Sequence, residues 1–95
     1  MKEGPFRALV GAVNREGFAE GKLNVVQEAV ARNVFGAEQV KALVGLMPFS
    51  ATKLRTLELC APRIVDPGNA FVIIEAFPFS ADKEQARQIL KRNGY

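Results

Sequence analysis

The sequence contains no histidine, no tryptophan and only one cysteine among its 95 residues. Without histidine, the chain cannot form a Ser-His-Asp triad, a Cys-His dyad or a zinc site built from cysteine and histidine ligands. A single cysteine also excludes an internal disulfide. Cys60 lies between Leu59 and Ala61, and no histidine is available to lower the pKa of its thiol. We therefore expect it to be a small buried hydrophobe.

Long apolar runs are also missing. The longest is Ala70–Ile74, which is far shorter than the roughly 20 residues that an α-helix needs to cross a bilayer. The first residues, Met1–Pro5, have no apolar region of the kind found in signal peptides. We therefore expect a cytoplasmic protein without a membrane span.

The overall composition is that of an ordinary globular domain. Hydrophobic residues make up 48% of the chain and charged residues 24%, with a formal net charge of +3. This balance disfavours disorder, and a chain of this length predicts a single domain over residues 1–95. The mild positive charge permits weak attraction to anionic surfaces without requiring it.

The most informative feature of the sequence is an internal repeat. Pro48–Lys53 returns 30 residues later as Pro78–Lys83, with five of six positions identical, and a weaker copy begins at Phe18. Repeats of this size are typical of stacked architectures, in which each unit covers the apolar face of the next. Between the first and second units, matching residues lie 34 positions apart in the first helix and 31 positions apart in the second. We therefore predict a three-residue insertion around Asn14–Gly17.

Apolar residues recur at helical spacing throughout the chain, and breaks at Gly and Pro divide it into six segments. We predict an all-α fold of three consecutive helical hairpins, about six helices, stacked as a small solenoid-like bundle. The units cover approximately residues 5–33, 36–65 and 66–94. The stretch Phe71–Ile74 is also compatible with a strand, but the repeat maps Leu43, Val44 and Met47 onto Ile73, Ile74 and Phe77, which favours a helix.

The predicted core and helix caps follow from this pattern. Ser50, Asp66 and Ser80 stand where helices begin and are predicted N-caps. Asp66 and Asn69 offer far too few oxygens for a calcium loop, which needs about 6–8, so we predict no metal site and no cofactor. The residues expected in the core are Leu9, Val13, Phe18, Leu23, Leu43, Met47, Phe49, Leu57, Ile73, Phe77, Phe79 and Ile89.

A set of short motifs at fixed spacing gives the chain a family resemblance. The motifs are Phe18–Leu23, Gln39–Val40, Phe49–Leu54, Asp66–Asn69 and Phe79–Ser80. Together they resemble a small domain family catalogued only as a domain of unknown function, over nearly the whole chain from Phe6 to Leu90. The resemblance implies an all-helical fold and assigns no activity. The sequence departs from the family pattern at Ala19, where a capping residue would stand, and at Glu84, where a leucine would follow the lysine.

Three lysines recur at equivalent positions, in the first turn of the second helix of each unit. They are Lys22, Lys53 and Lys83. A cation there opposes the helix dipole, at a cost of about 0.3–1 kcal/mol where it is exposed. One interpretation is that each lysine lays its aliphatic stem over the preceding phenylalanine and keeps its ammonium in water, or pairs with an acid from the next hairpin. The other is that the three ammoniums form a docking strip for an acidic partner.

These observations favour a non-catalytic helical module that binds another protein or a peptide, with Lys22, Lys53 and Lys83 as candidate binding residues. One alternative is a weak binder of anionic surfaces or nucleic acid that uses the same lysine edge. Nucleic acid is disfavoured because the basic residues are scattered among ten acids and no aromatic stands beside a basic cluster. A second alternative is a subunit or domain of an enzyme, whose site would need Lys, Asp or Glu alone in a pocket.

Overall fold

The computed structural model describes all 95 residues and consists of helices, with one isolated bridge between Phe35 and Ile64 and no strand. The elements in chain order are α1 (Glu3–Arg15), α2 (Ala19–Val30), α3 (Ala37–Gly45), α4 (Ser50–Cys60), the 3₁₀ helix η1 (Ala61–Arg63), the 3₁₀ helix η2 (Pro67–Ala76) and α5 (Ser80–Arg92). No helix is both long and apolar enough to cross a membrane.

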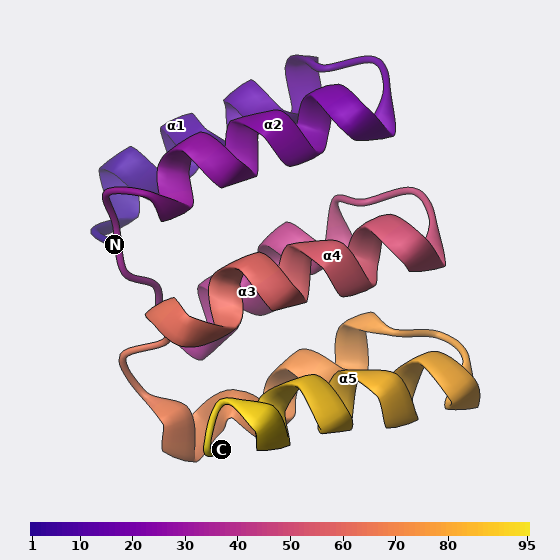
Figure 1. The fold of residues 1–95 in the computed structure, drawn as a ribbon. Coiled ribbons are helices and arrows are strands. Elements are labelled where there is room, and N and C mark those ends of the chain that lie inside the picture. Colours follow the sequence, from indigo (N-terminus) through magenta and orange to yellow (C-terminus); the bar gives the residue numbers. More distant parts are fainter.

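The helices pair into three hairpins, α1 with α2, α3 with α4 and η2 with α5, which are stacked one on the next (Figure 1). The prediction of an all-α bundle of stacked hairpins is therefore confirmed. The loops inside the hairpins, residues 16–18, 46–49 and 77–79, lie together on one side of the stack, which we call the loop edge. The linkers between hairpins, residues 31–36 and 64–66, lie on the opposite side, which we call the linker edge.

The fifth helix differs from the α-helix that was predicted. η2 is a 3₁₀ helix of ten residues, whereas such helices rarely exceed 3–4 residues. Its β-branched and aromatic stretch Phe71–Ile74 loses side-chain freedom in an α-helix, and the tighter form places residues three apart on one face. Ala70 and Ile73, which are three apart, are its two buried residues. Packing of η2 against α3 therefore favours a period of three in this segment.

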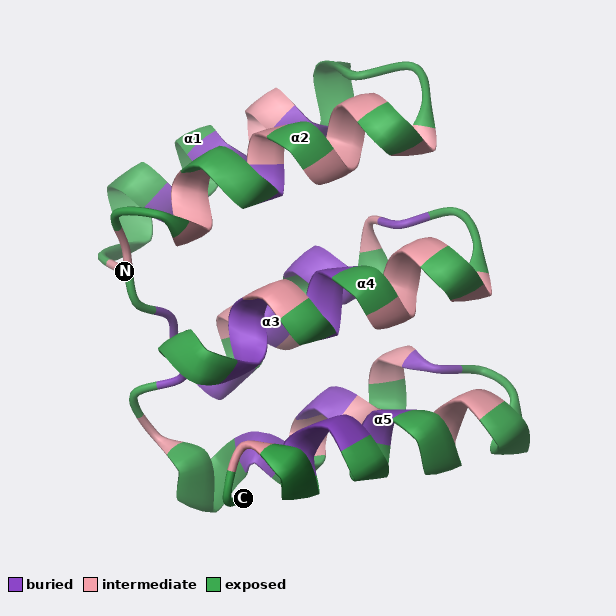
Figure 2. Cartoon of the chain, viewed as in Figure 1, coloured by how far each residue is buried: buried purple, intermediate pink, exposed green.

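One cluster of buried residues runs through the stack, as the buried positions in Figure 2 show. Eight of the twelve predicted core residues belong to it, namely Leu9, Val13, Leu43, Met47, Leu57, Ile73, Phe77 and Ile89, and Leu23 packs against it half-buried. Phe18, Phe49 and Phe79 were predicted in the core, and this is wrong because all three are exposed. Phe35, which the prediction omitted, is fully buried.

Cys60 is buried at the end of α4, as expected. Burial raises the pKa of its thiol to about 12, because the surrounding apolar side chains disfavour the thiolate. The only buried polar side chain is that of Thr56, whose Oγ1 donates a hydrogen bond of 2.8 Å to the carbonyl oxygen of Thr52. No buried side-chain polar atom lacks a partner.

The predicted serine caps require a correction. Ser50 and Ser80 are the first helical residues of α4 and α5, and the N-cap residues are Phe49 and Phe79, which cannot cap through their side chains. Ser50 Oγ instead donates a hydrogen bond of 2.5 Å to Asp82 Oδ2. This bond joins the first turns of α4 and α5, so Ser50 links two hairpins instead of capping its own helix.

Asp66 is a helix cap, but not of the helix for which it was predicted. The backbone N–H of Ala37, the first residue of α3, donates to Asp66 Oδ1 at 2.7 Å. The side-chain amide of Asn69 donates to Asp66 Oδ2 at 3.2 Å, and η2 itself has no side-chain cap. Asp66 therefore satisfies an N-terminal amide of α3 in the preceding hairpin.

Candidate functional site

The loop edge is built from one arrangement that occurs three times. In each hairpin the second helix begins after a phenylalanine in extended conformation, whose carbonyl oxygen accepts a hydrogen bond from the backbone N–H of the lysine four residues later. The pairs are Phe18 with Lys22 (3.1 Å), Phe49 with Lys53 (2.9 Å) and Phe79 with Lys83 (2.9 Å). This bond closes the first turn of the helix and fixes the phenylalanine backbone at its start.

The side chain of the same lysine crosses back to the helix before the loop. Each ammonium donates to a backbone carbonyl oxygen nine residues earlier. The pairs are Lys22 Nζ with Val13 (3.2 Å), Lys53 Nζ with Val44 (3.3 Å) and Lys83 Nζ with Ile74 (3.3 Å). These carbonyls lie near the C-termini of α1, α3 and η2, where a cation is favourable. We call each such bond a lysine clasp, because it joins the two helices of a hairpin across their loop.

The clasps also correct the predicted insertion. The separation between lysine and carbonyl is nine residues in all three hairpins, so the loop of the first hairpin is no longer than the others. Val13 is structurally equivalent to Val44, at an offset of 31, the same offset that relates Phe18 to Phe49. The additional residues of the first unit lie in its first helix, since α1 has 13 residues and α3 has 9.

The structure thus brings Lys22, Lys53 and Lys83 to one edge of the molecule, as the sequence predicted, and gives each ammonium a partly buried hydrogen bond inside its own hairpin. The interpretation in which the lysine is structural fits this geometry, although the ammonium bonds a carbonyl instead of remaining in water. A docking role for the three lysines stays a prediction.

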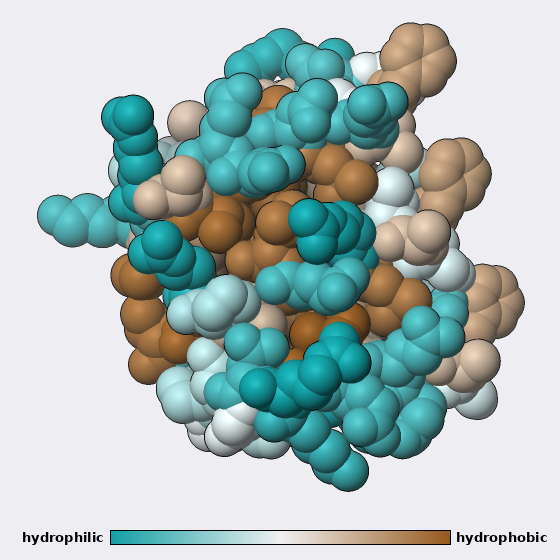
Figure 3. All heavy atoms as spheres, in the orientation of Figure 1, coloured by the Kyte–Doolittle hydropathy of each residue, from teal (hydrophilic) through white to brown (hydrophobic).

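The phenylalanines at the helix starts project from the loop edge. Their exposed fractions are 83% for Phe18, 63% for Phe49 and 63% for Phe79, and Figure 3 shows three aromatic side chains standing out one beneath another along that edge. We call these three residues the Phe ladder. Phenylalanine usually lies in the core, but here it is exposed to solvent at the same position of three successive units.

The residues around the Phe ladder explain why the rings have no intramolecular cover. Small side chains follow each ring, namely Ala19, Ser50 and Ser80, and prolines precede two of them, Pro48 and Pro78. The core positions are filled two residues earlier, where Met47 and Phe77 are buried. A signal for this was present in the sequence, because an aromatic residue at an N-cap stands outside the apolar stripe of the helix that it begins.

No group of three or more Cys, Asp or Glu side chains comes together in the molecule. The acids that interact with cations do so in three exposed pairs, Arg7 with Glu3, Lys41 with Glu75 and Arg87 with Glu84. The shortest, Lys41 Nζ to Glu75 Oε1 at 2.7 Å, joins α3 to η2. Its hydrogen bond raises the pKa of Lys41 and lowers that of Glu75. Of the three pairs, only Lys41 with Glu75 joins two hairpins, since the other two lie within single helices.

Comparison with known proteins gives one match. The family model described as "Domain of unknown function (DUF4476)" matches residues 1–90, which include all three clasps and the whole Phe ladder. No curated protein and no solved structure matches the chain.

Proposed function

We propose that this chain, which belongs to the DUF4476 family of domains of unknown function, is a non-catalytic module that binds another protein or a peptide through the Phe ladder. The observation that carries the proposal is the exposure of Phe18, Phe49 and Phe79 at equivalent positions of one edge. Single exposed hydrophobic residues are common on proteins, but rings gathered along one edge are typical of interaction surfaces.

The free energy of burying a phenylalanine side chain favours a role of the three ladder rings as binding anchors. Burial of a phenylalanine side chain is worth about 1.5–3 kcal/mol, and none of the three rings obtains this within the domain. Aromatic residues are enriched in the centres of protein interfaces, where a few anchors in fitted pockets supply most of the binding energy. The ladder therefore offers binding energy that folding leaves unused.

The lysine clasps prepare this surface for binding. Each clasp and each carbonyl–amide bond fixes the backbone that carries a ring, so less conformational freedom is lost when a partner binds. Helices that pack together lie roughly 8–10 Å apart, and the three rings belong to successive hairpins of one stack. The partner that fits is a protein or peptide with apolar pockets repeated at about this distance.

The alternative of nucleic acid or another anionic surface depends on the lysines. Single-stranded nucleic acid stacks its bases on aromatic rings, but it also needs cations along its backbone. The ammoniums of Lys22, Lys53 and Lys83 are bonded inside the hairpins, and Asp82 adds a carboxylate to the same edge. These features favour a protein partner over a polyanion.

The test starts from peptides selected on the immobilised wild-type domain and then measures their affinity for a variant with Phe18→Ala, Phe49→Ala and Phe79→Ala. We expect the affinity to fall at least tenfold, since truncation of one anchor typically costs about 1–2 kcal/mol or more. The matched control is Phe71→Ala with Val65→Ser, which removes exposed apolar side chains away from the ladder. That control should bind like the wild type.

Equal binding to the wild type and to the ladder variant would contradict the proposal, provided that both unfold at the same urea concentration. A single-stranded oligonucleotide measured on the same two proteins separates the alternative. Salt-sensitive binding that is lost in a Lys22→Gln, Lys53→Gln and Lys83→Gln variant, with no selected peptide, would support a polyanion partner instead.

A further inference from the structure

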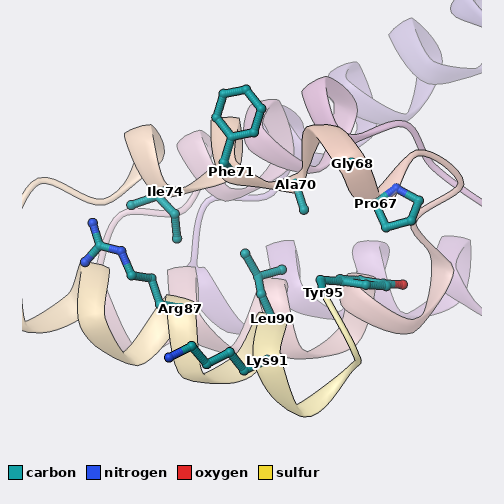
Figure 4. Close-up of a pocket in the computed structure, with 9 residues that line it drawn as sticks. All are labelled: Pro67, Gly68, Ala70, Phe71, Ile74, Arg87, Leu90, Lys91 and Tyr95. Atoms are coloured by element: carbon teal, nitrogen blue, oxygen red, sulfur yellow. The ribbon is translucent and has the colours of Figure 1, made fainter.

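A second surface feature lies on the last hairpin, away from the loop edge. A groove of about 320 Å³ runs between η2 and α5, within the range of pockets that hold small molecules. Figure 4 shows Ala70 and Ile74 of η2 facing Leu90 of α5 across it, with the ring of Tyr95 and Pro67 at one end. The walls of the groove are therefore mostly apolar.

Two cationic side chains stand beside the groove. Arg87 and Lys91 stand one helical turn apart on α5 and both line it, whereas no acidic residue does. Arg87 reaches only the exposed Glu84, at 3.6 Å, and Lys91 takes part in no ion pair. Both side chains are exposed. Two cations beside an apolar slot make the groove complementary to a molecule with an apolar body and one anionic group.

The repeat shows that this groove is specific to the last hairpin. The positions 30 residues before Ala70, Ile74, Arg87, Leu90 and Lys91 are Val40, Val44, Leu57, Cys60 and Ala61. All five of those residues are buried. In the last hairpin, two of the five have become cations while the other three remain apolar. The last hairpin therefore combines two exposed cations with apolar residues at positions that are buried in the preceding hairpin.

The end of the chain gives the groove a fixed wall. Gly94 adopts a positive φ of 83°, which ends α5 in the left-handed turn that glycine allows. The backbone N–H of Tyr95 then donates to the carbonyl oxygen of Leu90 at 3.0 Å, and its hydroxyl donates to that of Ala61 at 2.7 Å. Two hydrogen bonds therefore hold the Tyr95 ring at the end of the slot.

We propose that this groove binds a small amphipathic carboxylate, with the apolar body against Ala70, Ile74, Leu90 and the Tyr95 ring, and the carboxylate between Arg87 and Lys91. The site is separate from the Phe ladder and does not depend on the binding function proposed above. The slot contacts the apolar body of the ligand. The guanidinium and the ammonium donate charge-assisted hydrogen bonds to its carboxylate.

The chain contains its own reporter for this site. Tyr95 is the only tyrosine, and there is no tryptophan, so tyrosine fluorescence reports on the groove alone. Sodium octanoate, kept below the concentration at which it forms micelles, is the probe, and octanol is its uncharged counterpart. We expect octanoate to change the Tyr95 emission in a saturable way and to bind at least tenfold more tightly than octanol, because only octanoate places an anion between Arg87 and Lys91.

Two variants with the same change of charge sharpen the test. Arg87→Gln with Lys91→Gln should lower octanoate affinity about tenfold or more and leave octanol affinity unchanged. Arg55→Gln with Arg92→Gln, which removes two exposed cations that do not line the groove, should bind octanoate with no more than about a twofold loss from the weaker general attraction.

Three results would overturn the proposal. One is the absence of any saturable change in Tyr95 emission while backbone amide shifts of residues 70, 74 and 90 also stay constant. Another is equal loss of affinity in the two double variants, which would mean that only net charge matters. The last is a concentration-dependent dimer that shields Tyr95 without ligand, which would make the groove an interface between copies of the chain.

Discussion

Phenylalanine side chains are buried on one edge of the stack and exposed on the other. On the linker edge Phe35 is fully buried, whereas on the loop edge Phe18, Phe49 and Phe79 are 63–83% exposed. Phe35 donates its N–H to the carbonyl oxygen of Arg63 and accepts from the N–H of Val65, both at 2.9 Å. The two linkers thus run side by side, and between them the side chain of Phe35 packs into the core cluster.

On the loop edge the phenylalanines lie at helix starts. Each ladder phenylalanine accepts from a lysine N–H at a helix start, and its ring projects away from the helix that it begins. Hydrophobicity alone therefore does not decide which phenylalanine is buried in this fold. The place of the residue in the fold also matters: Phe35 lies where two linkers pair, whereas each ladder phenylalanine is the N-cap residue of a helix.

The largest effect is expected at the linker edge. Phe35→Ala removes a fully buried ring and leaves a cavity, so the free energy of unfolding should fall by about 3–5 kcal/mol. Urea denaturation followed by circular dichroism measures this change. Phe71→Ala, at a ring that is 67% exposed, is the control and should alter stability by about 0.5 kcal/mol or less. A loss at Phe35 no larger than the control would remove the distinction between the edges.

A second prediction tests whether water is excluded from Cys60, at the end of α4 next to the linker edge. The pKa of the Cys60 thiol is about 12 in the fold and about 8.5 in an unfolded chain. Between these values the unfolded state releases the proton and the folded state keeps it. The thiol therefore contributes full stability below the lower pKa and loses about 1.4 kcal/mol per pH unit above it.

This loss is measured as the difference in unfolding free energy between the wild type and Cys60→Ala, from pH 7 to pH 10. Other groups that titrate in this range cancel in the difference. The advantage of the wild type should be constant near neutral pH and shrink towards pH 10. A constant difference across the whole range would show that water reaches Cys60.

A third prediction concerns the cap that joins two hairpins at the linker edge. Asp66→Ala leaves the N–H of Ala37 without its side-chain acceptor, which should cost about 0.5–2 kcal/mol of stability. Glu38→Ala, at an exposed acid in the first turn of α3, is the charge-matched control and should cost less. If the two variants unfold at the same urea concentration, the capping role of Asp66 is contradicted.

The smallest effect is expected from a single clasp. Lys53→Met keeps the aliphatic stem and removes the bond to the carbonyl oxygen of Val44, so a loss of about 0.5–1.5 kcal/mol is expected. Lys91→Met removes an exposed ammonium that bonds no carbonyl and serves as the control. Equal stability of the two variants would mean that the clasp contributes nothing and that the repeated lysines serve another purpose.

Much of the architecture could be predicted from the repeat and the helical spacing of apolar residues. The error at the Phe ladder is a shift of one residue, because the sequence pattern predicts the cap at Ser50 and places Phe49 before it. In the structure Phe49 is itself the N-cap. At the earlier position a ring packs back on its helix, whereas at the N-cap it projects away from it.

The other differences also follow from physical ambiguities. A shift of three residues is nearly one helical turn, so the apolar stripe of α1 matched α3 at an offset of 34 as well as at the true offset of 31. Asp66 had a cap signature, but the sequence could not indicate that folding would bring Ala37 beside it. The 3₁₀ geometry of η2 was missed because ten residues of sequence do not distinguish such a helix from an α-helix.

The most direct test of the account compares urea unfolding of Phe35→Ala with that of the combined Phe18→Ala, Phe49→Ala and Phe79→Ala variant. If Phe35 belongs to the core and the ladder to the surface, the three ladder substitutions together should cost less than about 1.5 kcal/mol, whereas Phe35→Ala alone costs about 3–5 kcal/mol. A ladder variant destabilised as strongly as Phe35→Ala would contradict the account.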